Sequence, residues 1–179
     1  MDAKTLEKLK EKAYKNACKK GFHDRAYRNT HWLALVAVEM SEAIEADRNG
    51  IHSISKSEFE ERIENGESYK VTFERFVKDS VEDELADVVV RLLDFAGLRK
   101  IEFKTEPKKY KYSNKLLITE FAFSFLSKMV EIGVTTDEVK NLIAMVFSYS
   151  EAIGVDLEWH ILAKMEYNKT RARLNGKNY

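Results

Sequence analysis

Two pairs of acidic residues, each set into an otherwise apolar helical segment, are the residues of this chain best suited to chemistry. Glu39 and Glu42 lie in HWLALVAVEMSEAIEADRNG, and Glu84 and Asp87 lie in VEDELADVVVRLLDFAGL. Residues at positions i and i+3 share one face of a helix, so each pair presents two neighbouring carboxylates. Such carboxylates repel each other and lose hydration on an apolar face unless a cation meets them. Two facing pairs would form a four-carboxylate site for a hard divalent cation such as Mg2+.

Other acidic residues nearby have a simpler interpretation. Acidic residues on a helix usually belong to a solvated face, and we interpret Glu45, Asp47 and Glu82 in that way. Asp83 lies three residues after Ser80 and is interpreted as part of an N-terminal capping box. The two pairs differ because the residues around them are apolar and leave no broad polar face.

A magnesium site of this kind favours hydrolysis at a phosphorus centre, because the metal can activate water and neutralise a leaving group. Asp94 follows Asp87 by seven residues on the same helical face. Glu45 continues the row after Glu42. Asp94 and Glu45 are therefore candidates for an outer ligand or a base. Arg91 is placed to form an i,i+4 ion pair with Asp87.

Several other catalytic chemistries lack their motifs in this sequence. A di-iron helical bundle needs a His three residues after a Glu, and none of the four histidines has that spacing. The sequence has no glycine-rich phosphate loop and no GxSxG elbow. Cys18 is the only cysteine, which excludes a disulfide framework and a cysteine zinc site.

The composition is typical of a single helical domain. The chain has 179 residues, of which 44% are hydrophobic and 34% charged, with one proline and seven glycines. This length can bury a sizeable core, and this residue usage favours helices. The formal net charge of zero gives no global attraction to nucleic acid or to an anionic membrane. Without a bilayer-spanning apolar run or a signal-peptide pattern, the sequence predicts a cytoplasmic location.

The hydrophobic pattern predicts an all-α helical bundle. Six helices are expected, with the approximate ranges 3–20, 29–49, 80–97, 114–132, 135–154 and 156–173. Their expected N-terminal caps are Asn29 or Thr30, Ser80, Thr135 and Asp156. Between helices, residues 50–78 show no clear order apart from one short helix at Ser57–Glu64, and residues 100–114 are interpreted as a linker or hinge. The helix at 114–132 is apolar on most sides, which predicts burial in the bundle or in a subunit interface.

The motifs EMSE, with Glu39 and Glu42, and EDELADVVVRLLD, with Glu84 and Asp87, resemble the ExxE and ExxD motifs of a known family. That family is the MazG-like group of all-α nucleoside triphosphate pyrophosphohydrolases. The segment GVDLEWHILAKMEYNKTRARLNGKNY is similar to the carboxyl end of many members, and RNTHW is similar to the lead-in to their first acidic helix. The resemblance covers about residues 22–99 and 154–179. Residues 50–78 and 100–153 depart from the compact family pattern.

The resemblance implies one all-α domain over residues 1–179, with a four-helix core and two additional helices. It implies cleavage between the α and β phosphates of a nucleoside triphosphate, which releases a nucleoside monophosphate and pyrophosphate. The cofactor would be Mg2+, or alternatively Mn2+, held by the four motif acids. The active sites of this family are often completed between subunits, so a homodimer or homotetramer is also implied.

The resemblance further implies substrate-binding roles outside the acidic motifs. Lys164 and Arg171 would contact phosphate oxygens, which suits their charges. Asn168 would donate to phosphate or sugar. His31 and Trp32 would help to form the base pocket, although core packing for Trp32 and a surface position for His31 are equally good readings.

Two functions of other classes remain as alternatives to an enzyme. One is a non-catalytic helical interaction module, to which the apolar helix beginning near residue 114 is equally suited. The other is a nucleotide sensor that keeps the pocket without turnover. The sequence selects neither the base nor the sugar of the nucleotide.

Overall fold

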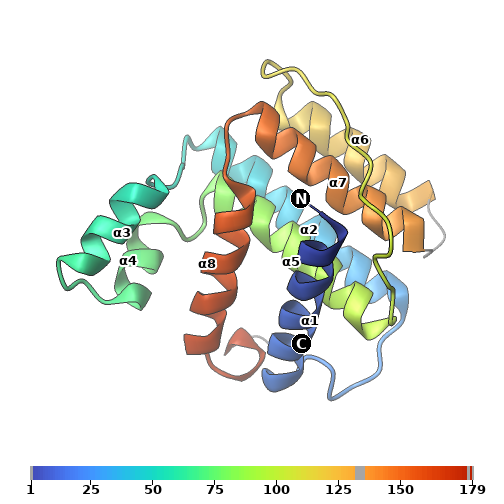
Figure 1. Cartoon of the computed structure of the whole chain (residues 1–179), viewed down its shortest axis with the longest axis horizontal. Helices are drawn as coiled ribbons and strands as arrows, with labels where there is room; N and C mark the ends of the chain where they lie inside the picture. Colours follow the sequence, from blue (N-terminus) through green and yellow to red (C-terminus); the bar gives the residue numbers. More distant parts are fainter. Residues whose placement is uncertain (1, 132–135, 177, 179) are drawn as a thin grey trace.

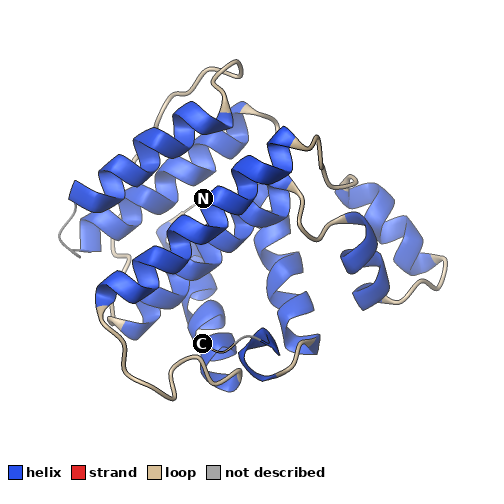
Figure 2. Ribbon diagram, turned by 180° about the vertical axis from the view of Figure 1, so that it is seen from behind, coloured by secondary structure: helices blue, strands red, loops and turns tan. Residues whose placement is uncertain are grey.

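The protein, described here from a computed structural model, is a helical bundle (Figures 1 and 2). The structure describes residues 2–131, 136–176 and 178, and these contain helices and loops but no strand. The described α-helices are α1 (Ala3–Lys19), α2 (Asn29–Arg48), α3 (Lys56–Glu64), α4 (Tyr69–Phe76), α5 (Val81–Leu98), α6 (Ile118–Glu131), α7 (Thr136–Ala152) and α8 (Leu157–Thr170). A 3-10 turn, η1 (Arg173–Gly176), follows α8. The predicted all-α class is confirmed. Within the described residues, no helix combines the length and apolar character needed to cross a membrane.

The expected helix starts agree with the structure where a side chain caps the helix. Ser80 Oγ accepts a hydrogen bond from the Asp83 N–H at 3.2 Å, and Asp156 Oδ1 accepts one from the Trp159 N–H at 3.1 Å. The expected cap of α2 is wrong, because Asn29 is already helical and its preceding residue makes no side-chain cap bond. The cap assigned to Thr135 lies outside the described residues.

The stretch between the two acidic helices is more ordered than its sequence indicates. It contains α3, close to the predicted short helix, and also α4, which the sequence pattern did not reveal. Both helices are too short to be stable alone, so tertiary packing must supply their stability. Phe73 of α4 stacks on Tyr167 of α8 with 4.5 Å between ring centroids, and Tyr69 Oη donates to the Ala163 carbonyl at 2.9 Å. The pair α3–α4 thus forms an arm that projects from the bundle beside α8 (Figure 1).

Helix α5 is the central element of the bundle. It packs against α1, α2, α7 and α8, and most of its residues are buried. Its apolar core residues are Val81, Leu85, Ala86, Val88, Val89, Leu92, Leu93, Phe95 and Ala96. Because α5 is surrounded, Glu84 and Asp87 lie between it and the neighbouring helices α2 and α8. The apolar residues that surround Glu84 and Asp87 in the sequence are therefore core residues of the bundle.

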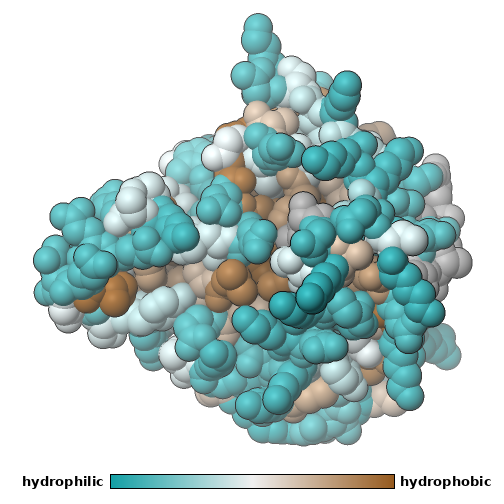
Figure 3. Space-filling model, in the orientation of Figure 1, coloured by the Kyte–Doolittle hydropathy of each residue, from teal (hydrophilic) through white to brown (hydrophobic). Residues whose placement is uncertain are grey.

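Helix α6 is amphipathic in the structure, although its sequence is apolar on most sides. Phe121, Phe125 and Met129 enter the main core, together with residues of α7. The opposite side exposes Phe123 at 76% and Val130 at 82%. By contrast, the face of the molecule drawn in Figure 3 is covered mainly by hydrophilic residues. Burial in the bundle is thus confirmed for one face of α6, and burial of its other face in a subunit interface stays a prediction.

The connection between α5 and α6 is anchored to the bundle along part of its length. Ile101 and Phe103 are buried, and Lys10 Nζ donates to the Ile101 carbonyl at 2.8 Å. Further along, the Tyr110 N–H donates to Ser148 Oγ of α7 at 3.1 Å. This segment therefore packs as part of the domain rather than as a free linker.

Gly97 allows α1 to approach α5 closely, which yields a test of the packing. A Cβ atom at this position would lie 2.4 Å from Tyr14 Cβ and 2.7 Å from Tyr14 Cγ. Glycine to alanine in a helix normally stabilises by about 1 kcal/mol. We expect Gly97→Ala to destabilise the fold instead, by about 1–3 kcal/mol, because α1 must shift. Urea denaturation followed by circular dichroism measures the change, with Ser127→Ala on the exposed side of α6 as the control. A Gly97→Ala protein as stable as the wild type would contradict this packing.

Candidate functional site

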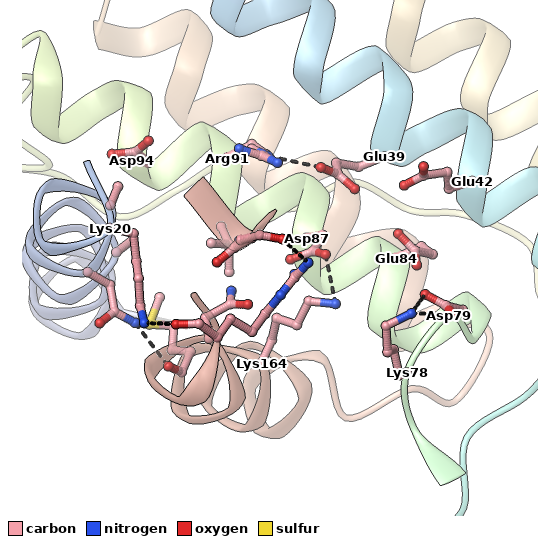
Figure 4. A pocket seen from close by; sticks show the side chains of 18 of the residues that line it. Lys20, Glu39, Glu42, Lys78, Asp79, Glu84, Asp87, Arg91, Asp94 and Lys164 are labelled. Atoms are coloured by element: carbon pink, nitrogen blue, oxygen red, sulfur yellow. Dashed lines mark hydrogen bonds and ion pairs between the residues drawn. The ribbon is translucent and has the colours of Figure 1, made fainter. Parts of the chain in front are cut away.

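Three of the four predicted carboxylates meet between α2 and α5. Oxygen atoms of Glu39, Glu42 and Glu84 all lie within 4.8 Å of one another. Glu39 and Glu84 are buried, whereas Glu42 is exposed, so the group opens to solvent on one side. Figure 4 shows the carboxylates facing one another across the space between the two helices. These three residues are called the carboxylate trio below.

The trio combines unfavourable electrostatics with an unused ligand atom. Burial, and then the neighbouring charge of Asp87, raise the pKa of Glu84 to about 9. Glu84 Oε2 is buried, and within the described part of the chain no group donates a hydrogen bond to it. A buried carboxylate oxygen without a partner is costly unless a cation or a proton meets it. Carboxylate oxygens are the ligands that magnesium prefers, so the residues present fit a hard divalent cation.

Asp87 lies beside the trio and is held by a lysine of α8. Lys164 Nζ lies 2.8 Å from Asp87 Oδ2 and 2.6 Å from Asp83 Oδ2. Burial alone would lower the pKa of Lys164, but Asp87 and Asp83 together raise it above its ordinary value. Lys164 therefore lies beside the carboxylates and is paired with two acids there, and its expected contact with phosphate oxygens stays a prediction.

Asp83 has a larger role than the cap predicted for it. It is fully buried, and Asp83 Oδ2 accepts both from Lys164 and from the Asp79 N–H, the latter at 3.1 Å. Burial raises the pKa of Asp83 to about 7, and Lys164 opposes that rise. Its position in the sequence could have indicated this role, because Asp83 precedes Asp87 by one turn on a helix that has no polar face to receive it. Oxygens of Asp79, Asp83 and Glu84 form a second group that lies within 4.8 Å.

Arg91 pairs with a different acid from the one predicted. Arg91 Nε donates to Glu39 Oε1 at 2.9 Å, across the interface between α5 and α2. The sequence pattern predicted an i,i+4 pair with Asp87, but Asp87 forms its ion pair with Lys164 instead. The side chain of Arg91 therefore links the two acidic helices, because Glu39 lies directly opposite it.

The trio borders a cavity of about 360 Å³ between α1, α2, α5, α8 and the C-terminal segment. Asn168 and Arg171 line it, so the structure brings both predicted residues to the same site as the carboxylates. Asn168 Oδ1 is buried and accepts no hydrogen bond from the described residues. Arg171 Nη2 donates to the Asn175 carbonyl at 3.2 Å. Lys78, paired with Asp79, lies at one end of the cavity (Figure 4).

His31 and Trp32 are not among the residues that line this cavity. Trp32 belongs to the buried stripe of α2 with Val36 and Met40, and only 4% of it is exposed. The His31 ring stacks on Tyr27 with 4.1 Å between centroids, and burial lowers the pKa of His31. Of the two readings for Trp32, the structure agrees with core packing, because α2 turns this face toward the bundle.

The sequence did not reveal the residues that α1 contributes to the cavity. Ala13, Asn16 and Ala17 share one face of α1 and line the cavity opposite α5. Asp94, named earlier as an outer ligand or base, also lines the cavity and lies 2.7 Å from His23 Nε2. Burial raises the pKa of Asp94, and the hydrogen bond from His23 opposes that rise. Nothing in the pattern of α1 distinguishes these cavity residues from an ordinary core stripe.

No family model, curated protein or solved structure matches this chain.

The raised pKa of Glu84 makes stability depend on pH. Between pH 4.5, which is the ordinary pKa of a glutamate, and about pH 9, Glu84 holds a proton in the folded protein that it has released in the unfolded chain. The free energy of unfolding should therefore fall as pH rises from about 5 to 9 in the presence of EDTA. Asp83 contributes in the same direction up to about pH 7. Glu84→Gln should reduce the fall, most of all above pH 7.

Magnesium competes with this proton, so its stabilising effect should grow as pH rises. Denaturation midpoints measured from pH 5 to 9, with EDTA or with MgCl2, test both statements. Glu82→Gln is a matched control, because Glu82 pairs with His52 outside the cavity. A metal-free protein whose stability stays level or rises over this range would contradict the description of the trio.

Proposed function

We propose that this chain is a MazG-like, magnesium-dependent nucleoside triphosphate pyrophosphohydrolase. The observation that carries the proposal is the carboxylate trio, in which acids from two helices converge and one buried oxygen, Glu84 Oε2, has no hydrogen-bond partner among the described residues. The adjoining cavity supports it, because Arg171 and Lys78 place positive charge along the same space. A site with acids for a metal and cations beside it suits a metal–triphosphate complex.

The trio and Asp87 would hold the metal, Mg2+ or Mn2+, in this proposal. When bound, the metal supplies positive charge to phosphate oxygens and acidifies a water molecule. Lys164 holds Asp87 in place and favours its ionised form. Arg171 would donate to phosphate oxygens, and Asn168 would use its amide on phosphate or sugar.

In the proposed reaction a water oxygen bonds to the α phosphorus, and the bond from that phosphorus to the bridging oxygen breaks. The pyrophosphate group leaves with the bonding electrons, and the water gives up a proton to a carboxylate of the site. The products are a nucleoside monophosphate and pyrophosphate. A role in removing unwanted nucleotides from the cell is consistent with this chemistry.

Pyrophosphate release from a panel of triphosphates with MgCl2 tests the reaction. Glu84→Gln should lower turnover on the order of a hundredfold or more, because a metal-held charge at the transition state is worth several kcal/mol. Glu82→Gln, on the same helix but outside the cavity, should keep most of the activity. Circular dichroism of both variants would confirm that they fold.

Two outcomes would favour the other functions. Orthophosphate in place of pyrophosphate would contradict the proposed bond. Tight binding of a non-hydrolysable triphosphate without any product would instead support a nucleotide sensor. Calorimetry without a magnesium signal would support a non-catalytic module.

We also propose that the chain forms a homodimer through α6, which would be the unit of any tetramer. Thr119, Phe123, Leu126 and Val130 follow heptad spacing along one side of α6. The spacing of these four positions is the same read in either direction along the helix. An antiparallel copy of α6 would therefore place Phe123 against Leu126 and Thr119 against Val130. Phe123 and Val130 are both more than three-quarters exposed, which leaves them free to pack in this way.

Light scattering after size-exclusion chromatography tests the dimer. Phe123→Asp should convert a wild-type dimer to monomer, because it places a charge at the centre of the apolar stripe. Val71→Asp, at an apolar arm residue that is 55% exposed, should leave the assembly unchanged. A wild-type protein that remains monomeric at high concentration would contradict the proposed α6 dimer.

A further inference from the structure

The cavity has two chemically different ends. Asp94 follows Glu84 by ten residues on α5, which separates them by about 15 Å along the helix axis. Figure 4 shows Asp94 and Lys20 on one side of the carboxylates and Lys78 with Asp79 on the other. The cavity therefore extends along α5, past the trio, toward α1.

The end near α1 suits a flat, uncharged group better than a phosphate. Ala13 and Ala17 are small, so they leave room between α1 and α5. Phe22 and Met165 also line the cavity and add apolar surface to it. Lys20 Nζ is already bound to the Lys169 carbonyl at 3.0 Å, near the end of α8. A base can pack against aromatic and apolar side chains of this kind, whereas a phosphate would lose hydration without a free cation.

Asp94 is held in one orientation at this end. Its Oδ1 shares a 2.7 Å hydrogen bond with His23 Nε2. The His23 ring lies between Tyr14 and Trp32, with centroid distances of 5.1 and 4.9 Å. Only 4% of Asp94 is exposed, and it lines the cavity, so its second oxygen is the acceptor available to a ligand. A buried side chain fixed by a second group is a typical arrangement for recognition.

Asn16 adds a second acceptor beside Asp94. Asn16 Nδ2 donates to the Met165 carbonyl at 2.9 Å, which fixes the amide with its nitrogen on α8. Its oxygen is then the atom left for the cavity. Two acceptors at one end favour a base edge that carries N–H donors and disfavour one that presents carbonyl oxygens.

We infer, on the basis of the proposed function, that this end of the cavity binds the nucleobase. We further infer that Asp94, oriented by His23, selects bases with an exocyclic amino group. Guanine, adenine and cytosine carry such a group, whereas hypoxanthine and uracil have a hydrogen or a carbonyl oxygen in its place. A carboxylate that accepts from an amino group discriminates by about 1–3 kcal/mol, which corresponds to about 5- to 150-fold.

The test compares matched substrates with the 179-residue chain in the presence of MgCl2. For the wild type, kcat/KM should be at least about fivefold higher for GTP than for ITP, and for CTP than for UTP. Asp94→Asn should abolish or reverse these ratios, because Oδ1 can stay on His23 while the new amide donates to a carbonyl. Asp47→Asn, at an exposed position of α2 outside the cavity, is the control and should keep them.

The possible failures are distinguishable. If triphosphates are cleaved but the kcat/KM ratios are the same in the wild type and in Asp94→Asn, the base assignment is wrong, whereas the proposed enzymatic reaction is supported. If nothing is cleaved, the proposed reaction is wrong, and calorimetry with GMP and IMP decides the base assignment. Tighter binding of GMP that Asp94→Asn abolishes would support it, and equal or absent binding of both would overturn it.

Discussion

The buried contact of Lys164 with Asp83 and Asp87 is the interaction on which the geometry of the site depends. It joins α8 to α5, the helix around which the bundle is built. Breaking a buried ion pair by removing one partner usually costs several kcal/mol, because the other charge stays behind without compensation. Lys164 is therefore both a structural tie and a source of positive charge next to the trio. Any role for it in binding phosphate must coexist with these two acids.

The negative charge at the trio and Asp87 is partly balanced by neighbouring cationic side chains. Arg91 reaches Glu39 from α5, and Lys164 reaches Asp87 from α8, so two of the four motif acids already have cationic partners. Glu84 is buried with one oxygen left without a partner in the described structure, and Glu42 faces solvent. The site is thus partly neutralised by the protein itself. A cation entering from the solvent side would meet carboxylate oxygens that the protein's own cations leave partly unpaired.

The sequence predicted the helices that have a periodic pattern of apolar residues. It also predicted the acidic residues that lie among apolar neighbours. The helices of the bundle and the convergence of Glu39, Glu42 and Glu84 belong to this group, because apolar spacing determines which faces are buried. Helix α4 was missed because its stability comes from packing on Tyr167, which no local pattern reports. The partner of Arg91 was also missed, since the i,i+4 rule considers one helix and ignores the helix across the interface. The cavity face of α1 looks the same in sequence whether it meets protein or ligand.

The arm formed by α3 and α4 looks detachable in the ribbon drawing, but its contacts indicate otherwise (Figure 1). The Phe73 ring centroid lies 5.7 Å from Lys164 Nζ, and Tyr167 Oη donates to Glu74 Oε1 at 3.0 Å. Excising residues 50–78 to recover a minimal domain would uncover the apolar side of α8 and admit water to the lysine. This segment thus shields the buried ion pair of Lys164 from water, and shortening it would raise the local dielectric around that pair.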